Sequence, residues 1–194
     1  TRRSSDLKRK GIREVFATIW GDDAAECVID STFAGMQLYA EHGYAREVDM
    51  AAVARRFAAC TGARWDDFMA TQAIDEVPGV PAGNPGMCNP SRWLLWQDPL
   101  LGMYDENVRG LGVGKHYAAL AARLDEAAAR QGDSAPAFRI LSRLCAALEL
   151  KAEVGIRLFD AYAARDRARL AALAREELPE IAKRVRELHR THRE

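Results

Sequence analysis

The 194-residue chain is long enough for one sizeable domain, alone or with a short piece of another domain attached. Its 28 basic residues balance its 28 acidic residues, so no net charge favours nucleic acid or an anionic membrane surface as a partner. Although 48% of the residues are hydrophobic, no apolar run approaches the roughly 20 residues needed to cross a bilayer. We therefore expect a soluble protein with no nucleic-acid or membrane partner.

The cysteines favour reduced thiols over disulfides or a metal site. They lie roughly 30 to 60 residues apart, with no CxxC pair and no histidine at zinc-ligand spacing. Thiols of this kind usually pack as small apolar groups, a usage that suits the cytoplasm. We expect a cytoplasmic protein without a metal or other cofactor. Because Thr1 is not a natural start residue, the true N-terminus is expected upstream, and the absence of a leader carries little weight.

The best strand candidate lies near the start of the chain. Residues 12–20 follow Gly11 and are rich in β-branched and aromatic side chains. One strand cannot stand alone, because its backbone donors and acceptors need neighbouring strands, and the sequence offers no second convincing run. Either this segment is repurposed here or its sheet lies outside the chain.

After this segment the apolar spacing predicts helices. A first helix runs to about residue 42, and a second opens at Asp49, a plausible N-cap, and ends before Gly62. A short third helix holds residues 65–69. Residues 76–89 contain three prolines and three glycines, which indicate a loop, and loops of this length are often functional or disordered.

The second half of the chain predicts longer helices. Asn89 and Pro90 resemble an N-cap followed by proline at the first helical position, and Pro99 must break or kink the helix that follows. Apolar stripes then predict helices over 115–130 and 134–164, and a last one that Pro179 kinks or divides. The stripe of the second runs from Leu141 to Phe159 and Tyr162, which predicts that it is buried. The expected fold class is all-α, an antiparallel bundle of about six helices with one orphan N-terminal strand.

Residues 20–23, Trp-Gly-Asp-Asp, form the sharpest local cluster, because they lie where the candidate strand ends and a helix begins. Ligand-binding side chains gather at the carboxyl ends of parallel barrel strands, and an indole with a carboxylate can hold a sugar. A structural interpretation stays open, since Asp23 can cap the helix and Glu26 can return the bond as in a capping box.

A second cluster combines aromatic and polar residues. Its members are Trp93, Trp96, Gln97, Asp98 and Tyr104. They offer enough aromatic and polar surface to line a pocket or an interface. Two tryptophans at helical spacing are, however, more often part of a core.

Two parts of the sequence resemble a known family. Residues 14–27 and 38–44 are similar to the last barrel strand and helix of family 20 glycoside hydrolases, the β-N-acetylhexosaminidases. Residues 89–105 and 150–158 resemble the extra helical C-terminal domain of a bacterial branch of that family. The resemblance implies that residues 1–44 complete a (β/α)8 barrel and that residues 45–194 form the helical domain.

This resemblance implies a substrate and a mechanism for the parent enzyme. Family members act on terminal N-acetylhexosaminides, and an Asp-Glu pair on an earlier barrel strand assists the substrate's own acetamido group in a retaining reaction. By resemblance, Trp20 packs against the sugar ring and Asp22 binds its distal hydroxyls. The Asp-Glu pairs at 75–76 and 125–126 follow no strand, so this chain alone should be inactive.

The preferred hypothesis is a C-terminal region that supports the barrel and mediates homodimerisation. Apolar seams on the last two helices and the cluster around Trp93 and Tyr104 motivate the dimer. The alternative is a stand-alone helical interaction or ligand-binding module, which would have no use for an orphan strand. A complete small hydrolase is a third hypothesis, but no carboxylate pair or histidine-based nucleophile motif stands at a convincing position.

Overall fold

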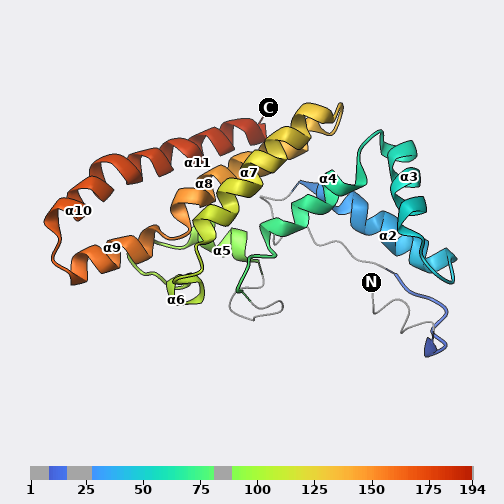
Figure 1. The fold of residues 1–194 in the computed structure, drawn as a ribbon, viewed down its shortest axis with the longest axis horizontal. Helices are drawn as coiled ribbons and strands as arrows, with labels where there is room; N and C mark the ends of the chain where they lie inside the picture. The colour runs from blue at the N-terminus through green and yellow to red at the C-terminus, as the bar shows by residue number, and fades with distance from the viewer. Residues whose placement is uncertain (1–8, 17–27, 81–88, 194) are drawn as a thin grey trace.

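The computed structural model describes residues 9–16, 28–80 and 89–193. Every regular element in these ranges is helical, which confirms the all-α class (Figure 1). In chain order the elements are η1 (Ile29–Thr32), α2 (Phe33–Tyr44), α3 (Met50–Thr61), α4 (Trp65–Ala70), η2 (Thr71–Ile74), α5 (Pro90–Trp96), α6 (Asp105–Val108), α7 (Val113–Arg130), α8 (Ala135–Lys151), α9 (Val154–Ala163), α10 (Arg167–Ala172), η3 (Leu173–Glu177) and α11 (Leu178–Arg193). None of these helices is both long and apolar enough to cross a membrane.

The predicted N-terminal strand is not confirmed. Residues 12–16, its described part, are irregular, and residues 17–20 lie outside the described ranges. The irregular segment contacts the helical body through Tyr39 of α2, whose Oη donates a 2.6 Å hydrogen bond to the carbonyl oxygen of Val15. Without a neighbouring strand among the described residues, the backbone groups of this segment have no ladder to join.

Helix α3 begins and ends where the sequence predicts. The Asp49 side chain accepts a 2.9 Å hydrogen bond from the backbone nitrogen of Ala51, as an N-cap does. At the other end Gly62 takes a left-handed conformation with φ 69°, which glycine adopts without a steric penalty. Both signals are local, so the sequence was sufficient to locate them.

An aromatic cluster joins the first helices to the rest of the molecule. The ring centroid of Phe57 in α3 lies 5.4 Å from that of Trp65 and 5.1 Å from that of Phe68, both in α4. Phe68 in turn meets Phe138 of α8 edge-on at 5.0 Å. Such edge-to-face pairs add to the gain from burial, so α4 links α3 to α8.

Helices α7 and α8 lie side by side and form the centre of the fold (Figure 1). Helix α7 covers the predicted range 115–130, and its buried face includes Tyr117 and Leu124. The facing stripe of α8 includes Leu144 and Leu148, which are fully buried. Each buried leucine stabilises the fold by about 1.5–3 kcal/mol relative to an exposed one.

The single helix predicted over 134–164 is wrong, because the chain breaks after α8 and restarts as α9. The break contains neither glycine nor proline. Its neighbours instead bond to other elements: Lys151 Nζ donates to the carbonyl oxygen of Gln97 at 2.8 Å, and Glu153 Oε2 accepts from the backbone nitrogen of Gly114 at 3.1 Å. These tertiary contacts turn α9 away from the axis of α8.

The last segment contains a π-helical turn where the sequence predicted a kink. This turn, η3, joins α10 to α11 just before Pro179. Proline has no backbone N–H, so it cannot donate to the carbonyl of Arg175 four residues earlier, and a wider turn relieves the mismatch. Helix α11 then packs on α8, where Arg184 Nη1 donates to the carbonyl oxygen of Ala146 at 2.7 Å.

Candidate functional site

The sequence-predicted sugar-binding residues Trp20 and Asp22 lie outside the described residues. The same is true of Asp23 and Glu26. Their roles therefore stay predictions. The candidate site that the described residues present lies elsewhere, around the second cluster.

The second cluster divides into an inner and an outer part. The ring of Trp93 packs against that of Tyr104 with centroids 5.4 Å apart, and both residues contact the hydrophobic core. Trp96, one turn later on α5, is 72% exposed. The core interpretation thus suits Trp93 and is wrong for Trp96.

Gln97 organises the turn that follows α5. Its side chain is buried, with Oε1 accepting from the backbone nitrogen of Tyr104 at 3.0 Å and Nε2 donating to Asp105 Oδ1 at 3.2 Å. Asp98 Oδ1 accepts from the backbone nitrogen of Leu100 at 2.8 Å. Burial raises the pKa of the Asp105 carboxyl. These hydrogen bonds fix both ends of the turn. Leu100 and Leu101 in its middle are exposed to solvent.

Lys151 anchors this turn to the end of α8. Its Nζ donates to the carbonyl oxygens of Leu94 and Gln97 at 3.2 and 2.8 Å, so it satisfies carbonyl groups at the C-terminal end of α5. Burial lowers the pKa of the Lys151 ammonium. The lysine therefore acts as a structural cap.

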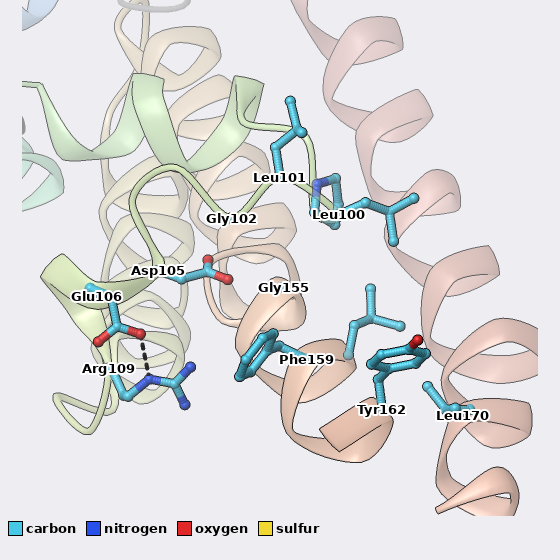
Figure 2. A pocket seen from close by; sticks show the side chains of 12 residues that line it. Leu100, Leu101, Gly102, Asp105, Glu106, Arg109, Gly155, Phe159, Tyr162 and Leu170 are labelled. Atoms are coloured by element: carbon cyan, nitrogen blue, oxygen red, sulfur yellow. Dashed lines mark hydrogen bonds and ion pairs between the residues drawn. The ribbon is translucent and has the colours of Figure 1, made fainter. Parts of the chain in front are cut away.

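A hollow of about 520 Å³ opens between this turn, α6, α9 and α10 (Figure 2). We call it the α9 groove. Its lining includes Leu100, Leu101, Asp105, Arg109, Phe159 and Tyr162. Phe159 and Tyr162 were predicted to continue the buried stripe of α8, but they are 62% and 74% exposed because α9 has turned away from α7. That part of the stripe prediction is wrong.

The charged side of the groove is held by Arg109. Its Nε donates to Glu106 Oε1 at 2.9 Å, and its Nη1 donates to Asp160 Oδ1 at 2.9 Å. These hydrogen bonds, first that of Glu106 and then that of Asp160, raise the pKa of Arg109. The guanidinium carbon also lies 6.0 Å from the ring centroid of Phe159. Arg109 therefore ties α6 to α9 across the groove.

The groove suits apolar contact better than catalysis. Leucine and aromatic residues make up half of its lining, and Glu106 and Arg109 are paired with each other. Sequence reasoning missed this site. The signal that could have found it is the pair Leu100 and Leu101 directly after the helix-breaking Pro99.

The Asp-Glu pairs have structural contacts. Asp75 Oδ1 accepts from the backbone nitrogen of Ser91 at 3.0 Å, and Asp125 lies within α7, where its Oδ2 accepts from Arg143 Nη1 at 3.5 Å. Neither follows a strand in the part of the chain that the structure describes. That part also holds no group of three or more metal-ligating side chains.

Comparison with known proteins identifies the family. No curated protein matches the chain. The family described as the Glycoside Hydrolase 20C C-terminal domain matches residues 66–194, which is well over half of the chain and spans α5 through α11. The match begins inside α4, so the division predicted between residues 44 and 45 stays a prediction. By this match the chain belongs to the family of glycoside hydrolase 20C C-terminal domains.

Proposed function

We propose that this chain is the C-terminal region of a β-N-acetylhexosaminidase, with a helical domain that supports the catalytic barrel. The single observation that carries the proposal is the family match over residues 66–194. The parent enzyme would hydrolyse terminal N-acetylhexosaminides by the substrate-assisted retaining mechanism, with Trp20 and Asp22 contacting the sugar. This match favours a hydrolase region over a stand-alone helical module.

Exposed apolar side chains near the N-terminus support contact with a barrel. Phe16 is 85% exposed and Tyr44 is 95% exposed, and Ile29 and Met36 are also exposed. Apolar groups gathered on one part of a surface usually mark an interaction site. Because they lie within or between the segments that resemble the last barrel strand and helix, we propose that the rest of the barrel covers them.

We further propose that the helical domain forms a homodimer. Apolar residues that remain exposed on α5, in the turn after it and on α9 support this role, among them Trp96, Met103 and Tyr162. They belong to the aromatic cluster and the helices that motivated the dimer hypothesis. A partner subunit would remove this surface from water.

The test of hydrolase function compares two proteins with a p-nitrophenyl N-acetyl-β-hexosaminide as substrate. We expect the protein encoded by the whole native reading frame to release p-nitrophenol and the 194-residue chain to release none. In the longer protein, Trp20→Ala should raise KM and Asp22→Ala should lower kcat/KM by about tenfold or more, because each removes a substrate contact. Hydrolysis by the 194-residue chain alone, or an inactive longer protein, would contradict the proposal.

A further inference from the structure

The α9 groove carries projecting and recessed apolar features on one face. Leu100 and Leu101 project from the turn after α5 and are 85% and 71% exposed. Beside them the hollow is walled by Phe159 and Tyr162 of α9 and by Leu170 of α10 (Figure 2). A surface that holds both the projecting side chains and the hollow able to receive them can pair with itself across a two-fold axis.

One end of the groove is acidic. Three carboxylates surround the single guanidinium of Arg109 there, those of Asp105, Glu106 and Asp160. The side chain of Glu106 is 81% exposed and that of Asp160 is 57% exposed, so both remain accessible to a partner. Their negative charge exceeds what Arg109 balances.

The other end of the groove is basic. A second hollow of about 410 Å³ shares Tyr162 and Leu170 with the α9 groove and is also lined by Arg165 and Arg167. Neither guanidinium has an ion pair within the described ranges. The nearby Asp166 carboxylate is engaged, since its Oδ1 accepts from the backbone nitrogen of Arg169 at 2.9 Å.

We propose that a second copy of this chain occupies the α9 groove. The leucines of each copy enter the hollow of the other, and the acidic end of each groove meets the basic end of its partner. A two-fold interface makes that charge contact twice, because each copy contributes both ends. The inference rests on the dimerisation proposed above and assigns it to a surface.

The position of the groove favours a second copy over the barrel of the same chain. Helices α9 and α10 lie at one end of the long axis of the molecule, and α2 and α3 lie at the other (Figure 1). The segments that resemble the barrel are those at the α2 end. The exposed apolar side chains of that end and those of the groove therefore serve different partners.

The first experiment measures the mass of the 194-residue chain by sedimentation equilibrium over a wide concentration range. We expect a dimer, and the double variant Leu100→Glu/Leu101→Glu should weaken it by about a hundredfold or more, since it places charges in an apolar interface. The matched control is Met36→Glu, an exposed apolar residue outside the groove that is 51% exposed. This variant should dimerise like the parent chain, and circular dichroism should show that all variants are folded.

The second experiment exchanges the charges. Glu106→Arg alone and Arg167→Glu alone should each weaken the dimer by about tenfold or more, because each puts like charges in contact. An equimolar mixture of the two variants should restore it, because both charge contacts of the mixed dimer then join opposite charges. If the dimer recovers in the mixture, the weakening seen with each single variant did not come from a loss of folding.

The outcomes separate the two proposals. If the unmodified chain stays monomeric, dimerisation fails and this inference fails with it. A dimer that is insensitive to the groove variants, or a mixture without recovery, overturns the inference and leaves dimerisation standing. None of these results bears on the hydrolase test, because that test measures the activity of the longer protein.

Discussion

Helices α8 and α9 are consecutive and share one apolar pattern, yet their apolar stripes differ in burial. Leu144 and Leu148 of α8 are fully buried between α7 and neighbouring helices, whereas Phe159 and Tyr162 of α9 remain exposed. The pattern only shows that a helix has an apolar face. Whether that face is covered depends on a partner, and α9 has turned away from the partner that α8 uses.

Truncating one side chain in each stripe is the strongest test of this difference in burial. Leu144→Ala should lower the free energy of unfolding by about 2–5 kcal/mol, because the side chain is fully buried and leaves a cavity. At concentrations low enough to keep the chain monomeric, Phe159→Ala should change it by about 0.5 kcal/mol or less, because the ring is largely exposed there. Urea denaturation followed by circular dichroism measures both, and equal losses would contradict the comparison.

Gly155 tests how closely α9 packs on the turn that carries the leucines. A Cβ at this position would lie 2.5 Å from Asp105 Oδ2 and 2.9 Å from the carbonyl oxygen of Pro99. Gly155→Ala should therefore destabilise the chain by about 1–3 kcal/mol through overpacking. The control is Gly132→Ala, where a Cβ would meet no atom within 4 Å. A midpoint shift in urea only for Gly155→Ala is the expected result.

Tyr117 tests a buried hydrogen bond between α7 and η2. Its Oη donates a 3.1 Å hydrogen bond to the carbonyl oxygen of Ile74, and the side chain is fully buried. Tyr117→Phe should cost about 1 kcal/mol, since it removes one hydrogen bond and leaves the ring in place. Thermal unfolding should show a small decrease in Tm. An unchanged Tm would show that this bond adds nothing to stability.

Asp105, which lines the α9 groove, is expected to give the smallest effect, a dependence of the free energy of unfolding on pH. Burial raises the pKa of the folded Asp105 carboxyl above the ordinary value of an aspartate, so its stabilising contribution is complete below that ordinary value and is lost as pH rises through the folded pKa. Asp105→Asn cannot ionise. The variant should therefore gain stability relative to the parent chain as pH rises from acid toward neutral, measured by urea unfolding at several pH values. A constant difference would count against the shifted pKa.

The candidate site was only partly predictable. The sequence pointed to the Trp93–Tyr104 cluster and to the break at Pro99, because aromatic residues and proline are local signals. It did not indicate that Gln97 and Lys151 hold the turn from opposite sides, since these residues are 54 apart in the chain and meet only after folding. The roles of Trp20 and Asp22 stay predictions.

The sequence by itself determined the all-α class, the ends of α3 and the range of α7, because capping residues and helical periodicity act within a few neighbouring residues. Only the tertiary structure decided that the chain breaks between α8 and α9, where contacts of Lys151 and Glu153 with distant elements outweigh the continuous apolar pattern. The break between α8 and α9 leaves Phe159 and Tyr162 exposed and opens the groove. Periodicity records which faces are apolar, and packing alone decides which of them meet a partner.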